Sequence, residues 1–285
     1  MAIPVFCLLA MGGTKKTTIL IRNSVLLAMA AAMILHVLPA TLFTLTLIPL
    51  GFTLNRSAAQ QQDEIVAGAK GLVVLGVTWI AYWTVYGTLM GMNPYLQLLQ
   101  VLDNMLVQAF ELYSTGTNIS SDTLLAVQQV VGKLRTLLPK ALPGILACTL
   151  LLTVWINLVG SLTTLERLKP EAIPWKKYSD WRLPEKLIWL PIIAGIFWIT
   201  GTDKLYGIGL SLILVSILLY FFQGLAVFIF FIDRWNVPLY MKIIIYGIGI
   251  LIFGSYGLLL LSVTGIADVW IDFRSRVDNE SQPDS

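Results

Sequence analysis

The sequence has few charged side chains, one histidine and two cysteines in 285 residues. Charged residues make up 12% of the chain and hydrophobic residues 57%, whereas a soluble domain has about 25% charged residues. So few charges cannot keep so apolar a chain in solution. The composition therefore excludes a soluble enzyme, a nucleic-acid-binding module and a disordered chain, and we expect no nucleic-acid partner.

The sequence has too few histidines and cysteines for a metal centre or a redox site built from these residues. His36 is the single histidine, so a centre built from several histidines is excluded. Cys7 and Cys148 are far apart in the sequence, which argues against a CxxC redox pair, a thiolate zinc site and a disulfide framework. We therefore expect no metal and no cofactor.

Long uncharged stretches dominate what remains. Six of them, of 16 to 33 residues, contain no Asp, Glu, Lys or Arg, and about 20 apolar residues suffice for a helix to cross the bilayer core. The predicted fold class is all-α, a polytopic transmembrane helical bundle in the lipid bilayer. Because no charge lies in these stretches to mark an ion pathway or catalytic site, we expect no enzymatic activity. The stretches are 23–55, 71–102, 141–165, 187–202, 205–232 and 243–267.

The number of spans depends on the stretch 23–55, which is long for one helix and short for two. Pro39 lies near its middle, where proline kinks or ends a helix. A hairpin there divides the Lys and Arg residues 13 to 6 between the two sides, and a single kinked helix divides them 10 to 9. Because cytoplasmic loops carry the excess of basic residues, we predict the hairpin. It gives about seven spans (six to eight), with the N-terminus in the cytoplasm and the C-terminus outside.

We expect one integral membrane domain over residues 1–285. The crossing at 187–202 is the weakest, because 16 residues reach only about 24 Å; if it is re-entrant, the C-terminal tail returns to the cytoplasm. The expected parts are an N-terminal leader (1–22), front spans with outer amphipathic helices (23–165), a cytoplasmic loop without a core (166–186), rear spans (187–276) and a polar tail (277–285).

Two amphipathic segments are expected between spans. Over 95–113, polar residues recur every three or four positions, and over 122–138 apolar residues recur with a similar spacing. Both follow Asn93-Pro94, where the preceding span is expected to end on the outer side. We therefore predict an amphipathic helical pair on the outer face, either packed on the bundle or covering a substrate.

Aromatic and amide side chains inside the spans are the candidate ligand contacts. Four aromatic residues share one face of the third span, where they could clamp a flat ligand or simply pack at an interface. Two amides lie in later spans, where they could contact a ligand or bond to a neighbouring helix. These candidates are Trp79, Tyr82, Trp83, Tyr86, Asn157 and Gln223.

Two other features are candidates for docking a partner. Ala28 and Ala32 form a small-xxx-small pattern, which lets two helices approach closely. The C-terminal segment 265–276 combines acidic, basic and aromatic residues, which suits either a membrane-boundary anchor or a docking surface. Its candidate docking residues are Asp268, Trp270, Asp272 and Arg274.

The ending GIADVWIDFRSR, residues 265–276, resembles the ending of the YybS-like family of uncharacterised bacterial membrane proteins. Leu183-Pro184 and the sequence FQGLA at 222–226 are similar to that family in the same order. The resemblance implies a multi-pass protein of the bacterial inner membrane.

The YybS-like family is in turn distantly similar to the substrate-binding subunits of energy-coupling-factor transporters. Those subunits bind a vitamin or a metal at the outer face and dock on a transmembrane coupling protein, which works with ATPase subunits. The similarity implies a small vitamin-like ligand here, and docking through Ala28 and Ala32.

Two functional hypotheses follow. The first is a small-molecule-binding subunit of a transporter, with the aromatic face of Trp79 to Tyr86 near the ligand. The alternative is a non-catalytic membrane scaffold that binds other proteins through the loop 166–186 and the Asp/Trp/Arg segment at the C-terminus.

Overall fold

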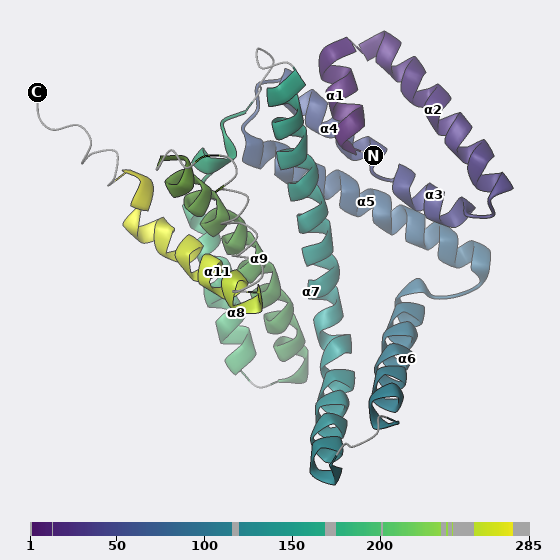
Figure 1. Ribbon diagram of the computed structural model, residues 1–285, viewed down its shortest axis with the longest axis vertical. Coiled ribbons are helices and arrows are strands. Elements are labelled where there is room, and N and C mark those ends of the chain that lie inside the picture. Colours follow the sequence, from purple (N-terminus) through teal and green to yellow (C-terminus); the bar gives the residue numbers. More distant parts are fainter. Residues whose placement is uncertain are drawn as a thin grey trace, which may run out of the picture.

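The computed structural model describes residues 2–12, 14–115, 120–168, 175–200, 202–234, 238, 241 and 254–275. Within these ranges the regular structure is helical and no strand is present, which confirms the all-α prediction. The long helix α7 runs between α1 to α6 on one side and α8, α9 and α11 on the other (Figure 1). The elements are α1 (Ala2–Gly12), α2 (Thr14–Ile34), α3 (Leu38–Leu45), α4 (Ile48–Ala59), α5 (Glu64–Met90), α6 (Pro94–Ser114), α7 (Ser121–Leu168), the 3-10 turns η2 (Tyr178–Asp180) and η3 (Glu185–Ile188), α8 (Trp189–Ile199), α9 (Asp203–Arg234) and α11 (Gly254–Ile271).

The first uncharged stretch is divided between separate helices. α2 ends at Ile34, His36 adopts a positive φ of 55°, and Pro39 lies in the first turn of α3. Proline suits that turn because the amide hydrogen it lacks would have no helical partner there. Lys15–Ile34 and Leu38–Ala59 are each long and apolar enough to cross a membrane, which confirms two candidate spans with a break before Pro39 rather than one kinked helix.

Five segments of the described chain have the length and composition of membrane spans. α8 is shorter: its 11 residues reach about 17 Å, against a hydrocarbon core of about 30 Å. Residues 243–253 of the last predicted span lie outside the described residues, as do Arg276 and the tail 277–285, and α11 covers the rest of that span. The five segments are Lys15–Ile34, Leu38–Ala59, Glu64–Met90, Ser121–Leu168 and Leu205–Arg234.

α7 joins two predicted elements in one helix of 48 residues. The amphipathic segment 122–138 was expected to end before the span 141–165, but the helix continues through Pro139 and Pro143. The prediction of a separate second amphipathic helix was therefore wrong. α7 is about 72 Å long at 1.5 Å per residue. α6 lies beside its N-terminal half, so the two amphipathic segments are paired, although the second is part of α7 (Figure 1).

The first part of the expected N-terminal leader, α1, belongs to the core. Phe6 of α1 is fully buried and its ring stacks on Trp175 at a centroid distance of 5.6 Å. Five apolar side chains of α1 are buried because the helix packs on α4 and α7. The main buried cluster is formed by Ala2, Phe6, Cys7, Leu50, Leu54, Ala67, Leu75, Val154, Leu158, Leu162, Leu165 and Trp175.

The connection before α8 also packs inside, contrary to the expected loop without a core. Residues 169–174 lie outside the described residues, but Trp175 and Ser179 are buried. Trp175 donates from Nε1 to the carbonyl of Gln62 at 3.0 Å. The prolines and charges of this segment indicated an exposed loop, whereas its aromatic side chains anchor it to the bundle.

α9 and α11 approach each other closely at two glycines. A Cβ on Gly224 would overlap the carbonyl of Leu261, and one on Gly265 would overlap the carbonyl of Tyr220. Only hydrogen in place of a side chain permits this crossing. The contact brings the C-terminal end of α11 beside Gln223 of α9, and so positions the polar groups described next.

Candidate functional site

A cavity of about 330 Å³ lies among α5, α7, α9 and the connection that carries η2 and η3. Its walls are almost entirely apolar, and aromatic rings form part of them. Pockets of this size and character commonly hold small organic molecules. The lining residues are Glu64, Ile65, Gly68, Ala69, Leu72, Leu151, Val154, Trp155, Leu158, Tyr178, Trp181, Arg182, Leu183, Leu187, Leu219, Phe222, Gln223 and Ala226.

The aromatic wall joins three separate parts of the chain. Trp155 of α7 stacks on Phe222 of α9 with nearly parallel rings and centroids 4.6 Å apart. Tyr178 meets the edges of Trp155 and Trp181, and its hydroxyl donates to the carbonyl of Phe222 at 2.6 Å. Burial raises the pKa of Tyr178 well above its ordinary value, so the hydroxyl keeps the proton that it donates.

A buried ion pair adjoins this wall. Arg274 Nη2 lies 2.6 Å from Asp268 Oδ2, and both side chains are at most 3% exposed. Gln223 Nε2 donates to the same Asp268 oxygen at 3.0 Å. Arg274 Nη1 donates to the carbonyls of Ser179 and Trp181 at 2.9 and 2.8 Å. The network therefore ties α9, the end of α11 and the connection before α8 to one another.

A second, exposed ion pair lies close by in the sequence. Arg182 Nη1 is 2.7 Å from Asp272 Oδ2, and Asp272 accepts a further bond from the amide of Ser275. Burial raises the pKa of Asp272, but the hydrogen bonds from Arg182 and Ser275 outweigh it and hold the pKa below its usual range. Since Arg182 lines the cavity, this pair fixes part of its rim.

Two lining residues have polar atoms without a hydrogen-bond partner. These are Trp155 Nε1, a donor, and Gln223 Oε1, an acceptor, and both atoms are buried. A buried polar atom without a partner is costly in a native protein. Both atoms therefore leave hydrogen-bonding capacity unused at the cavity.

Comparison with protein families matches residues 1–269 to one family, described as predicted membrane protein (DUF2232). The chain belongs to this family. No curated protein matches the chain, and no solved structure does either. The family description gives membrane character and no activity. Neither the YybS-like likeness nor the similarity to vitamin-transporter subunits is confirmed by the match.

In this family member the predicted aromatic face packs against α3. Phe43 lies within 5.7 Å of the rings of Trp79, Tyr82 and Trp83, measured between centroids. Trp79 Nε1 donates to Thr46 Oγ1, and the Tyr82 hydroxyl donates to the carbonyl of Pro39. Tyr86 stacks on Tyr82. These rings are occupied by contacts within the protein and do not line the cavity.

The two predicted amides lie in different surroundings. Asn157 is buried and donates to the carbonyl of Thr153 in its own helix, without lining the cavity. Gln223 lines the cavity and bonds to Asp268. Of the six candidate ligand residues, Gln223 is the one that the fold brings to this site.

The predicted docking residues divide between interior and surface. Asp268 and Arg274 are buried and paired with each other, so they cannot present a docking surface as they stand. Trp270 is 69% exposed, and Asp272 is partly exposed in its pair with Arg182. Ala32 is buried and Ala28 half-buried on the side of α2 that faces the rest of the protein. The docking role itself stays a prediction for the exposed residues.

Sequence reasoning did not identify the cavity residues on α7 and on the connection. Trp155 lies within an apolar span, where an aromatic residue is ordinary, and Tyr178 and Trp181 lie between charged residues and prolines. The feature that could have indicated them is the number of aromatic residues in 175–181, within the segment 166–186, whose charges and prolines are otherwise typical of a polar loop.

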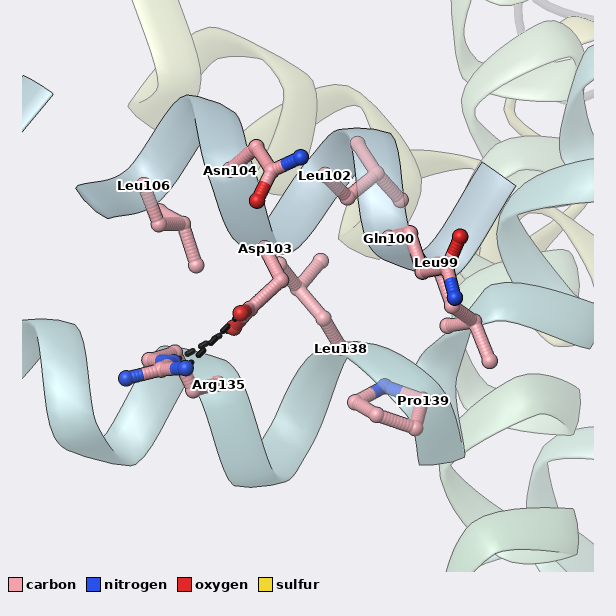
Figure 2. A pocket seen from close by; sticks show the side chains of 9 residues that line it. All are labelled: Leu99, Gln100, Leu102, Asp103, Asn104, Leu106, Arg135, Leu138 and Pro139. Atoms are coloured by element: carbon pink, nitrogen blue, oxygen red, sulfur yellow. Dashed lines mark hydrogen bonds and ion pairs between the residues drawn. The ribbon is translucent and has the colours of Figure 1, made fainter. Parts of the chain in front are cut away.

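A second hollow, of about 400 Å³, lies between α6 and α7 and surrounds an exposed ion pair. Figure 2 shows Asp103 of α6 and Arg135 of α7 pointing toward each other, with Leu138 and Pro139 beside them. Both guanidinium nitrogens that face Asp103 bond to its carboxylate. The hydrogen bond from Arg135 lowers the pKa of Asp103. This pair joins the two amphipathic segments, and Asp103 belongs to the polar stripe on 95–113.

Proposed function

We propose that this protein is a non-catalytic membrane subunit that binds a small apolar molecule containing a flat ring. The observation that carries the proposal is the cavity among α5, α7 and α9, whose wall includes the stacked rings of Trp155 and Phe222. Aromatic rings favour stacked or edge-on contact with another ring. The donor at Trp155 Nε1 and the acceptor at Gln223 Oε1 could pair with one acceptor and one donor on the ligand.

The place of the cavity supports entry from the cytoplasmic side. It lies at the Glu64 end of α5 and against the connection 175–187, both predicted to be cytoplasmic. We therefore propose a subunit of the bacterial inner membrane that receives its ligand from the cytoplasm or the inner leaflet. The resemblance described above suggests a more specific role. In that role the protein is the ligand-binding subunit of a transporter, and its partners are a transmembrane coupling protein and ATPase subunits.

Extraction of small molecules from the purified protein tests the proposal. Gly68 lines the cavity, and a Cβ there would make ordinary contact with Leu158 at 3.6 Å. Gly68→Ala is therefore a matched control that leaves room for a ligand, whereas Gly68→Trp fills the cavity.

We expect mass spectrometry to find the same ring-containing molecule in the wild type and in Gly68→Ala, and at least tenfold less in Gly68→Trp. Equal amounts in all three proteins, or no molecule above the detergent background in the wild type, would contradict the proposal. Equal unfolding temperatures of the two variants establish that both are folded.

One observation favours the scaffold as a second candidate. Trp270 is exposed at the end of α11, two residues before Asp272, which pairs with Arg182. A photo-crosslinking residue in place of Trp270 should then capture one defined protein, and one in place of the exposed Leu27 should not. Crosslinks to lipid alone would identify Trp270 as a membrane-boundary anchor instead.

A further inference from the structure

A groove between α4 and α5 brings two basic side chains together. It has a volume of about 710 Å³, and Arg56 of α4 and Lys70 of α5 both line it. Hydroxyl and amide groups add to its polar end, and valines of α5 form the rest. The lining residues are Thr53, Arg56, Ser57, Gln60, Ala69, Lys70, Val73 and Val74.

The two cations have no acidic partner in the described part of the chain. Lys70 Nζ donates to the neutral amide oxygen of Gln62 at 2.8 Å, and the salt bridges found there do not include Arg56 or Lys70. Two uncompensated positive charges at one groove attract an anion. Arginine in particular matches the oxygens of a phosphate group.

The groove is polar at one end and apolar along α5. Val73 follows Lys70 by about one helical turn and is 64% exposed, and the exposed side chains of Val77 and Ile80 continue up the same helix. A phosphate at Arg56 and Lys70 would therefore leave a hydrocarbon chain lying along these residues. The basic end is also on the predicted cytoplasmic side, where anionic lipids concentrate.

We propose that this groove binds an anionic phospholipid, with the lipid phosphate between Arg56 and Lys70 and an acyl chain along Val73. The groove is distinct from the cavity among α5, α7 and α9: Ala69 lines both, but the polar residues of the groove and Val73 do not line the cavity. A lipid site explains why Arg56 and Lys70 line the same groove. The general excess of basic residues on the cytoplasmic side does not require them to do so.

Native mass spectrometry of the full-length protein in detergent tests the site, with dioleoyl-phosphatidylglycerol or dioleoyl-phosphatidylcholine added. The test variant is Arg56→Gln with Lys70→Gln. The control is Arg22→Gln with Lys133→Gln, which removes the same charge from exposed positions outside the groove. Arg56→Lys with Lys70→Arg keeps the charge.

We expect the wild type, the control and the charge-keeping variant to retain one phosphatidylglycerol. The test variant should bind it about 25-fold more weakly, because each basic residue near anionic lipid contributes about fivefold. Equal loss in the test and control variants, or equal retention of phosphatidylcholine by the wild type, would overturn the proposal.

Two further measurements identify the occupant. Val73→Asn keeps both cations and places an uncharged polar group on the acyl path, so it should weaken lipid retention and leave the unfolding temperature in lipid-free detergent unchanged. Inorganic phosphate should fail to compete at millimolar concentration. Competition by free phosphate, with Val73→Asn retaining lipid, would show a simple anion site and overturn the lipid assignment.

Discussion

At the scale of single residues, the C-terminal segment shows how far a motif can be interpreted. The sequence there combines acidic, basic and aromatic residues at Asp268, Trp270, Asp272 and Arg274. This combination suits either a docking surface or a membrane-boundary anchor. The fold gives Asp268 and Arg274 a third role, a buried pair that holds the connection 175–182 in place. Their spacing of six residues does not indicate that pair, because it depends on the turn at Asp272, where φ is 45°.

Removing one member of this pair should be severely destabilising. Arg274→Met leaves the Asp268 carboxylate buried without a cation, and losing one partner of a buried ion pair costs about 3–5 kcal/mol. We expect this loss in reversible unfolding by a denaturing detergent. Replacement of both residues, Arg274→Met with Asp268→Leu, should recover part of the stability. Arg182→Gln breaks only an exposed pair and serves as the control, with a loss below about 1 kcal/mol.

Asp272 should make a small contribution to stability that depends on pH. Its pKa is lower in the folded protein than in the unfolded chain, so the folded state favours the ionised carboxyl. The contribution is present above the ordinary carboxyl pKa of about 3.9 and is lost as the pH falls through the lower folded value. Unfolding temperatures from pH 7 to pH 3 should therefore fall more in the wild type than in Asp272→Asn. Parallel curves would contradict this assignment.

At the scale of elements, helix breaks were easier to predict than helix continuity. Pro39 correctly indicated a break, because it lies at a helix start where its ring is tolerated. The separation predicted between the segments 122–138 and 141–165 was wrong, since α7 continues from one to the other through Pro139 and Pro143. Neighbouring helices make the difference: Gly144 of α7 packs on Ser211 of α9, whose hydroxyl accepts from the Gly144 amide at 3.1 Å. Such a partner cannot be seen in the local sequence.

The crossing of α9 and α11 should be sensitive to a single methyl group. Gly224→Ala places a Cβ against the carbonyl of Leu261, and overpacking of this kind costs about 1–3 kcal/mol. It should also separate Gln223 from Asp268. Gly132→Ala in α7 is the matched control, since open space surrounds that position, and it should leave stability unchanged or raise it slightly. A similar unfolding temperature for both variants would show that the crossing tolerates expansion.

At the scale of the whole molecule, the distribution of charge predicts which ends of the bundle face the cytoplasm. With a break at Pro39, basic residues divide 13 to 6 between the two sides. The structure supports the break, and it places the cavity and the basic groove at the same predicted cytoplasmic end. It puts the α6–α7 pair at the other end of α5.

Cysteine labelling of intact cells should confirm this orientation. In a background with Cys7 and Cys148 replaced by alanine, Thr115→Cys near the end of α6 should react with a membrane-impermeant maleimide in whole cells. Gln60→Cys after α4 should react only after permeabilisation. Both positions are exposed. The reverse pattern would invert the topology and remove the argument for cytoplasmic access to the cavity.

By itself, the sequence determined the membrane class, the helical class, the break near Pro39 and the amphipathic contact of α6 with α7. Each of these depends on local composition or on a period within one segment, so the residues that decide it are neighbours in the chain. Only the tertiary structure decided the site. Gln223 and Asp268 are 45 residues apart, and they meet because Gly224 and Gly265 let two helices cross closely. Ser179 and Arg274 are 95 apart and meet where the connection before α8 packs on the end of this pair. The few charges that identified the chain as a membrane protein include the buried pair that organises its cavity.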